Sequence, residues 1–274
     1  MQESDRSELT LSDCWAALER AKGLAWLGLP RFLGGRWGRI DPDEYEHYNN
    51  PLNADLHQIV PGKLFAFRAP KHLKGLDYLD DGCGCRHFSP SYYVDLFRQM
   101  GISSVVSVDP ISYDASEFAR QGLHHHELDY GDWAAPSQEA VAGFFRVVDA
   151  ARGGVAVHSA GGHGRNGTLI ALYLMRRHGF RAQEAVAWLR ICRPGSVVAE
   201  QHAFLCRLEA AAAAQGLPPG RSILKASSAS PRDVPVAVLV ARRASTSLPS
   251  PQTGRVLLRR RPAAGSRRRL VDLL

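Results

Sequence analysis

One short segment combines residue types and spacing that could bind a phosphate group. It reads Val157-His158-Ser159-Ala160-Gly161-Gly162-His163-Gly164-Arg165-Asn166-Gly167-Thr168. An apolar stretch precedes it and a hydrophobic helical pattern follows it, so a glycine-rich turn is expected between a buried strand and a helix. The N–H groups of such a turn and of the helix N-terminus attract an anion, and Arg165 offers paired donors to phosphate oxygens. The segment therefore predicts an oxyanion site, most simply for phosphate.

Three motifs overlap this segment. Gly162 to Gly167 spells G-x-G-x-x-G, typical of dinucleotide-binding domains, which also need an acidic residue at the end of the next strand; Glu184 has roughly that spacing but lies in a helical pattern. Ser159 resembles a nucleophile elbow, G-x-S-x-G, but Val157 replaces the first glycine and a suitable acid followed by a histidine is lacking downstream. The third motif, H-C-x-x-G-x-x-R, fits at every position except the cysteine, where Ser159 stands.

The elements that must hold this turn can be read from the surrounding pattern. Strands are predicted at 64–67, 103–108, 123–128 and 154–158, and helices at 7–27, 91–99, 114–121, 137–151, 166–178, 182–192 and 200–214. Residues 70–89, rich in Gly and Asp, are predicted to form a loop. Strands that alternate with helices predict an α/β fold, with a short, largely parallel sheet covered on both faces. The strand at 154–158 should be central, because it is apolar along its length.

Composition places the chain among ordinary globular proteins. Of its 274 residues, 45% are hydrophobic and 22% are charged. The five cysteines are an odd number, which argues against a disulfide scaffold and favours a cytoplasmic or nuclear location. No apolar run approaches the roughly 20 residues that a membrane span needs, and the first residues do not resemble a secretory signal.

Charge is distributed unevenly along the chain. Residues 219–274 hold 12 Lys and Arg but only 2 Asp and Glu, whereas the remainder is mildly acidic. The tail is also rich in Pro, Ser and Ala, a composition typical of disorder. Its clusters Arg259–Arg261 and Arg267–Arg269 could bind an anionic surface or an import receptor. A tail that is simply solvated fits the same composition equally well. No specific recognition of nucleic acid is expected.

The third motif belongs to a longer resemblance. The relevant stretches are Gly-Thr-Leu-Ile-Ala-x-Tyr-Leu-Met at 167–175, Ala-Trp-Leu-Arg-Ile-Cys-Arg-Pro-Gly-Ser-Val at 187–197, Asp-Glu-Tyr-Glu-His-Tyr at 43–48 and Ile-Val-Pro-Gly-Lys-Leu-Phe-Ala-Phe at 59–67. They resemble the cell-division-cycle-fourteen family of dual-specificity protein phosphatases, so the likeness covers roughly residues 8–213. The resemblance implies the fold of the cysteine-dependent phosphatases.

In that family a helix joins two phosphatase-like domains. This chain would hold that helix and the second, catalytic domain. The resemblance therefore implies a linker helix and connecting segment at 1–52, a dual-specificity phosphatase-like domain at 53–215 and a basic, disordered tail at 216–274. It implies no metal and no cofactor. Its substrates would be proteins phosphorylated on Ser or Thr before Pro, with some action on phosphotyrosine. Basic residues after the phosphosite would suit the acidic run Asp41, Asp43, Glu44 and Glu46.

The resemblance also implies a role for individual residues. Asp132 stands at the general acid, on a loop between a predicted strand and helix that suits a movable acid. Gln201 stands at the glutamine that helps to place the hydrolytic water, and His158 precedes the nucleophile. Asn166 stands where the family has Ser or Thr. The phosphate would lie against Ser159, Ala160, Gly161, Gly162, His163, Gly164 and Arg165.

A serine at position 159 changes the expected chemistry. A loop of N–H groups at a helix N-terminus can stabilise a thiolate at neutral pH, but the pKa of an alcohol starts several units higher. An alkoxide is also a poor leaving group, so a phosphoserine at Ser159 would persist. Binding should be retained, because no thiolate repels the phosphate dianion. We expect phosphate recognition with weak or absent hydrolysis; the alternative is a purely non-catalytic phosphoprotein-binding scaffold.

Two histidine-containing clusters suggest metal sites less strongly. His124, His125 and His126 are neighbours on a predicted strand and should point to opposite faces, as ordinary strand residues do. Cys83, Cys85 and His87 lack an evident fourth ligand, which favours a solvent-exposed loop. His163 could contact substrate, but a solvated side chain is the simpler interpretation.

Overall fold

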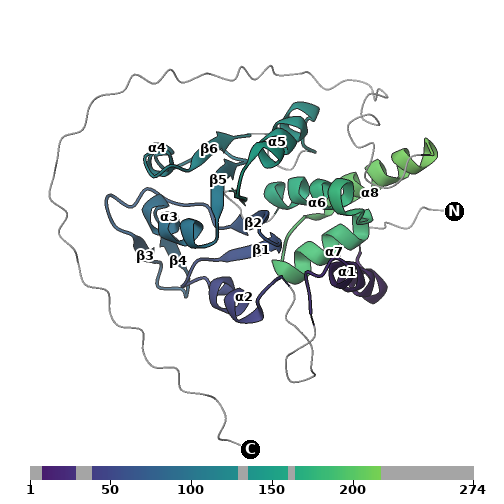
Figure 1. The fold of residues 1–274 in the computed structure, drawn as a ribbon, viewed down its shortest axis with the longest axis horizontal. Coiled ribbons are helices and arrows are strands. Elements are labelled where there is room, and N and C mark those ends of the chain that lie inside the picture. The colour runs from purple at the N-terminus through teal and green to yellow at the C-terminus, as the bar shows by residue number, and fades with distance from the viewer. Residues whose placement is uncertain (1–7, 29–38, 129–134, 160–163, 217–274) are drawn as a thin grey trace, which may run out of the picture. The chain divides into compact units, whose positions relative to one another are not determined.

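A five-stranded sheet forms the centre of the fold (Figure 1). The computed structural model describes residues 8–28, 39–128, 135–159 and 164–216. The strands lie in the order β1 (Leu56–Val60), β2 (Leu64–Phe67), β7 (Gly154–His158), β5 (Ile102–Ser107) and β6 (His124–Glu127). Neighbours pair in parallel, except that β1 and β2 form an antiparallel hairpin. β7 is therefore central, as predicted, and each of its residues is buried.

Helices cover both faces of this sheet, which confirms the predicted α/β class (Figure 1). The larger core includes residues of α1 (Leu11–Gly23), α5 (Gln138–Ala150), α6 (Arg165–His178), α7 (Ala182–Cys192) and α8 (Ala199–Ala214). The second core includes residues of α3 (Pro90–Gln99) and α4 (Ser116–Ala119). The alternation along β7 divides the two, because Val155 and Val157 lie in the larger core and Ala156 lies in the second.

The first helix packs into the larger core. Thr10 and Asp13 form a capping box at its N-terminus, which satisfies backbone N–H groups that the helix leaves without a partner. On its buried face, Ala17 and Ala21 are fully covered, and Arg20 Nε donates a hydrogen bond to Glu184 Oε2 of α7 at 2.8 Å. A segment this short buries little surface alone, so its stability depends on the elements beside it.

Short polar elements were the ones that the sequence did not predict. β1 was missed because His57 and Gln58 interrupt its apolar pattern. β3 (Tyr78–Asp80) and β4 (Arg86–Phe88) form a hairpin inside the region expected to be a loop. Every residue of β3 is exposed, so no alternation of apolar and polar residues marks it as a strand. Asp41 caps the N-terminus of α2 (Pro42–Asn49), and its side chain accepts a hydrogen bond from Asp43 N at 2.9 Å.

Contacts divide the chain into two units, residues 1–230 and 231–274, and all described residues lie in the first. Within these residues, no helix has the length and apolar character needed to cross a membrane. The predicted tail is outside the described part, apart from Gly216.

Candidate active site

The segment singled out from the sequence connects the central strand to α6. Ser159 directly follows β7 and is only 2% exposed, and Gly164 precedes Arg165, the first residue of α6. Ala160, Gly161, Gly162 and His163 lie outside the described residues. In open α/β sheets, ligands bind beyond the carboxyl ends of the parallel strands. The end of β7 and the first turn of α6 therefore lie at the edge of the sheet where a ligand of this fold class binds.

Ser159 has a weak hydrogen-bond partner. Its Oγ donates to Asn166 Oδ1 at 3.4 Å, and the same oxygen accepts from Gly167 N at 2.8 Å. An amide oxygen is a neutral acceptor and does not take a proton from an alcohol. Among the described residues, no other hydrogen-bond partner of the Ser159 hydroxyl is recorded. This part of the chain therefore supplies no base that would activate Ser159 as a nucleophile.

Arg165 is held by a buried carboxylate that the sequence analysis missed. Its Nη2 forms an ion pair with Asp109 Oδ1, and the two side chains are 13% and 3% exposed. Asp109 follows β5, which lies beside β7 in parallel, so both strands end at the same edge of the sheet. An acidic residue directly after the strand predicted at 103–108 was the available signal. The ion pair orients the guanidinium and offsets its charge.

Gln201, to which the resemblance assigns a role in placing water, lies against Gly164. It is in the first turn of α8 and is 2% exposed. A Cβ atom at Gly164 would lie 2.8 Å from Gln201 Oε1 and 3.1 Å from Nε2, so a side chain at position 164 would displace the amide. The structure thus brings together His158, Ser159, Gly164, Arg165, Asn166 and Gln201. Asp132 lies outside the described residues.

His158, Tyr113 and His125 form a series of hydrogen-bonded polar side chains. The Tyr113 hydroxyl lies 2.7 Å from His158 Nε2 and 2.8 Å from His125 Nε2 on β6. A phenol has one proton, so one ring nitrogen accepts from Tyr113 and the other donates to it. Burial lowers the pKa of His158 to about 3, and it lowers the pKa of His125 to about 4. Both rings are therefore neutral at pH 7 and position Tyr113 between them.

These two histidines make the fold sensitive to acid. Above their ordinary pKa of about 6.5, the rings are neutral in the folded and the unfolded chain alike. Below it, the unfolded chain takes up protons that the folded chain does not bind. The free energy of unfolding therefore falls as the pH is lowered. We expect this loss to begin near pH 6.5 and to continue to about 4 for His125 and about 3 for His158. Urea unfolding from pH 7 to pH 4 measures it, and His125→Asn should make the decline shallower. An equal decline in that variant would contradict this account.

The structure places the residues of the two candidate metal clusters in other local interactions. In the described part of the chain, no group of three or more His, Cys, Asp or Glu residues is placed to hold a metal ion. His125 instead bonds Tyr113, and His124 beside it on β6 is exposed. Cys83 and Cys85 lie in the turn between β3 and β4, where their N–H groups donate to Asp81 Oδ1 at 2.8 and 3.0 Å.

Comparisons with known proteins agree with the sequence resemblance. Residues 92–212 match the family described as PTP-SAK, Swiss Army Knife protein, DSP-PTPase phosphatase domain. The chain is 38% identical over 197 residues to the tyrosine-protein phosphatase cdc-14 of Caenorhabditis elegans, which covers 72% of this chain and 26% of that protein. It is 35% identical over 197 residues to the human dual specificity protein phosphatase CDC14C, with 72% and 41% covered. The chain thus spans about a quarter of the length of the first relative and about two fifths of the second.

Solved structures with similar folds include PTPMT1 in complex with PI(5)P, at 16% identity and a TM-score of 0.46, covering 59% of this chain and 98% of that one. Another is TpbA of P. aeruginosa, at 18% identity and a TM-score of 0.40, covering 61% and 86%. The identity to the CDC14 proteins and the match to the family agree with the central β7–α6 segment and its arginine. The chain therefore belongs to the dual-specificity phosphatases, as a domain homologous to the CDC14 phosphatases.

Proposed function

We propose that this domain recognises phosphorylated Ser, Thr or Tyr side chains of proteins and hydrolyses them weakly or not at all. The observation that carries the proposal is the pairing of an arginine at the phosphate segment with an unactivated serine at the nucleophile position. Arg165 and the N-terminus of α6 supply the anion-binding groups. Ser159 donates only to an amide oxygen among the described residues, so its attack on phosphorus is slow.

The remaining roles in this proposal rest on the resemblance to the family. Asp132 would protonate the leaving oxygen of the substrate, and Gln201 would place the water that attacks a phosphoenzyme. The position of Gln201 against Gly164 supports its role. A purely non-catalytic phosphoprotein-binding scaffold is the second candidate, and the buried, weakly bonded Ser159 hydroxyl favours it. The two differ only in residual turnover.

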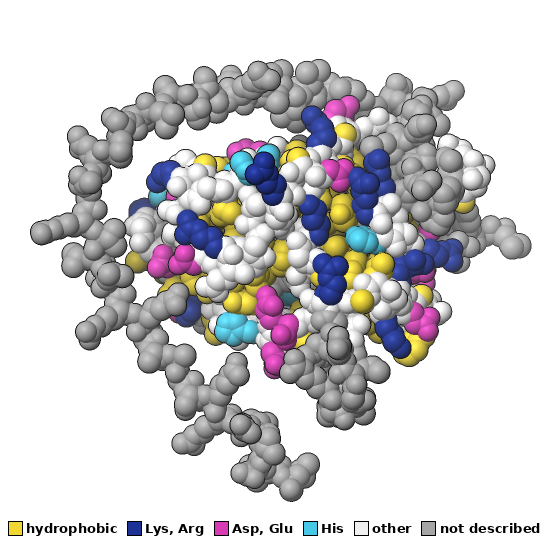
Figure 2. Space-filling model, in the orientation of Figure 1, with side chains coloured by type: hydrophobic (Ala, Val, Ile, Leu, Met, Phe, Trp, Pro, Cys, Tyr) yellow, Lys and Arg dark blue, Asp and Glu magenta, His cyan; other side chains and the backbone are white. Residues whose placement is uncertain are grey.

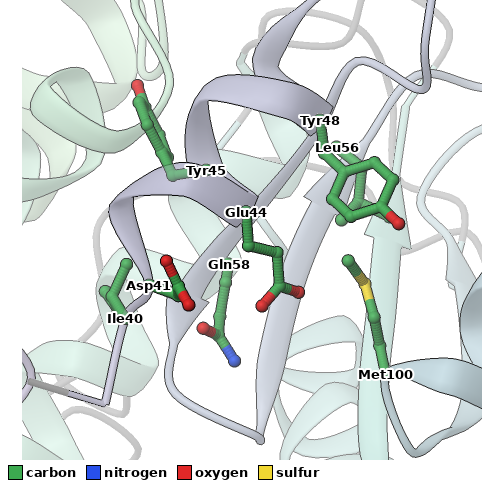
Figure 3. Close-up of a pocket in the computed structure, with 8 residues that line it drawn as sticks. All are labelled: Ile40, Asp41, Glu44, Tyr45, Tyr48, Leu56, Gln58 and Met100. Carbon is green, nitrogen blue, oxygen red and sulfur yellow. The ribbon is translucent and has the colours of Figure 1, made fainter. Parts of the chain in front are cut away.

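The surface of α2 supports a preference for basic residues near the phosphosite. Acidic side chains gather over this helix (Figure 2). Beside it lies a small pocket lined by Ile40, Asp41, Glu44, Tyr45, Tyr48, Leu56, Gln58 and Met100. Figure 3 shows the Glu44 carboxylate near Gln58, with the side chains of Tyr48 and Met100 on its other side. Burial and the charge of Asp41 raise the pKa of Glu44, so a cation that approached Glu44 would relieve an unfavourable charge.

A panel of phosphopeptides tests the proposal. The unaltered chain should bind phosphorylated Ser-Pro and Thr-Pro peptides, and basic residues after the phosphosite should strengthen binding by about fivefold, as expected for one or two exposed charge pairs. Glu44→Gln should remove much of that preference and leave the affinity for phosphate itself unchanged. Glu19→Gln removes the same charge from an exposed position on α1 and is the matched control. A strong preference for acidic flanks would contradict the proposal.

Other parts of the proposal concern residues outside the described ranges. The arginine clusters at 259–261 and 267–269 would let the tail bind an anionic surface or an import receptor. A cytoplasmic or nuclear location is proposed with them. Deleting residues 219–274 should reduce such binding and leave phosphopeptide binding unchanged.

A further inference from the structure

Two arginines hold the segment between α7 and α8. Arg190 donates from Nε to Ser196 O at 3.0 Å and from Nη2 to Val197 O at 2.8 Å. Arg193 is the C-cap of α7, and its carbonyl oxygen accepts from the N–H of Ser196 at 3.2 Å and from the Ser196 hydroxyl at 2.8 Å. Residues 193–198 are therefore fixed by hydrogen bonds from both side chain and backbone.

The guanidinium of Arg193 is buried in a polar cluster at the start of β1. Its Nη1 lies 2.8 Å from Asp55 Oδ1, 3.1 Å from Asp55 O and 2.7 Å from His57 Nδ1, and the side chain is 3% exposed. A guanidinium only donates, so His57 Nδ1 accepts and its Nε2 carries the proton. That Nε2 lies 2.7 Å from Asn49 Oδ1, at the end of α2. The cluster thus ties α2 and β1 to the end of α7.

The other side of residues 193–198 faces the first turn of α6. A Cβ atom at Gly167 would lie 3.1 Å from Val197 Cγ2 and 3.3 Å from Val197 N. Val198 N donates to Gln201 Oε1 at 3.4 Å, and this amide is the one that packs on Gly164. The segment that Arg193 fixes therefore supports the helix turn containing Arg165 and also directs Gln201.

Two residues of this assembly adopt a backbone conformation that non-glycine residues rarely enter. Asp55 has φ of +49° and Val197 has φ of +62°. Such conformations persist where the surrounding contacts determine them, and they cluster at functional sites. One lies in the cluster that binds Arg193 and the other lies against Gly167, so the strained positions mark the two ends of the same series of contacts.

We propose that Arg193 is a positioning residue of the phosphate site. Clamped by Asp55 and His57, it fixes residues 193–198, which in turn set the first turn of α6 and the amide of Gln201. The proposal rests on the proposed function, because it assigns Arg193 to the site that binds phosphate. It also means that α2, whose surface would contact the residues after the phosphosite, is mechanically connected to the phosphate segment through Asn49 and His57.

Tungstate affinity of the whole chain tests the proposal, with Arg193→Gln as the disruptive variant. We expect the tungstate affinity to fall by about tenfold, because a remote change that displaces binding groups by a fraction of an ångström weakens their contacts; a full 1 Å displacement can cost about a hundredfold. Hydrogen exchange at the amides of residues 165–168 should also speed up. Arg68→Gln is the matched control, because Arg68 donates to the other oxygen of Asp55 at 2.7 Å. This variant removes a positive charge beside the same carboxylate, but Arg68 forms no hydrogen bond with residues 193–198 among the described contacts.

Equal tungstate affinity and equal exchange in Arg193→Gln and Arg68→Gln would overturn the proposal, because Arg193 would then serve stability alone. If Arg193→Gln does not fold, Gly167→Ala decides the question, since its methyl group presses on Val197 and removes no charge. That variant should weaken tungstate binding, and unchanged binding would overturn the proposal. Failure of the proposed function is distinct: the unaltered chain would then not bind tungstate, or Arg165→Lys would bind it equally well.

Discussion

The Ser159→Cys variant is expected to turn over phosphopeptides several orders of magnitude faster than the unaltered chain. The residue follows the central strand, precedes the N-terminus of α6 and is buried. The N-terminus of a helix lowers the pKa of a thiol, so a thiolate would form at neutral pH, whereas an alcohol stays protonated. A thiolate also leaves phosphorus readily in the second step, which an alkoxide does not. Hydrolysis of a phosphotyrosine peptide at pH 6 to 7 measures the gain.

Asn166→Thr should add to the rescue by Ser159→Cys. The Asn166 amide oxygen accepts from the Ser159 hydroxyl at 3.4 Å, whereas a threonine hydroxyl could donate to the departing sulfur. Ser159→Ala, which removes the hydroxyl and supplies no thiol, is the matched control and should be no more active than the unaltered chain. Ample activity in the unaltered chain would mean that a base outside the described residues activates Ser159. No activity in the double variant would place another lesion in the site.

Arg165→Lys is expected to weaken phosphate binding by about 30-fold, equivalent to about 2 kcal/mol for hydrogen bonds to a charged group. Lysine keeps the charge but loses the planar pair of donors that fits a phosphate. It also presents a different shape to Asp109, whose carboxylate now orients the guanidinium. Titration calorimetry with tungstate measures the loss.

Two comparisons show whether that loss is specific to Arg165. Arg120→Lys makes the same substitution in an exposed arginine–aspartate pair, with Asp114 at 2.7 Å, and should leave tungstate affinity unchanged. Deleting residues 219–274 removes 12 basic residues and should also have little effect. A loss from the deletion that equals the loss from Arg165→Lys would mean that the anion binds elsewhere.

The sequence predicted the parts of the site that are local in the chain. Strand, turn and helix follow one another from Gly154 to His178, and the glycine and arginine positions carry the signal for an anion. The sequence did not identify Asp109 and Tyr113 as site residues, because each contacts a partner distant in sequence. Asp109 pairs with Arg165, and Tyr113 bonds His158. The pairing of β5 with β7 brings the segments after the two strands close together, and a pattern along one stretch of chain does not show which strands are neighbours.

The same distinction holds for the fold. β7 was predicted to be central because a strand buried on both faces is apolar throughout. The β3–β4 hairpin is fully exposed in β3 and is held by its ladder and by Arg86 with Asp80, so it has no hydrophobic pattern to read. The role of Arg193 was equally hidden, because its partners Asp55 and His57 precede it by more than a hundred residues.

Binding and turnover measured on one preparation of the unaltered chain test the central claim most directly. A phosphopeptide with a basic flank is titrated into the protein, and the release of inorganic phosphate is followed in the same sample. The account predicts saturable binding that Arg165→Lys weakens, together with phosphate release equal to or only slightly above that of Ser159→Ala. Phosphate release far above that of Ser159→Ala would contradict it, as would the absence of binding.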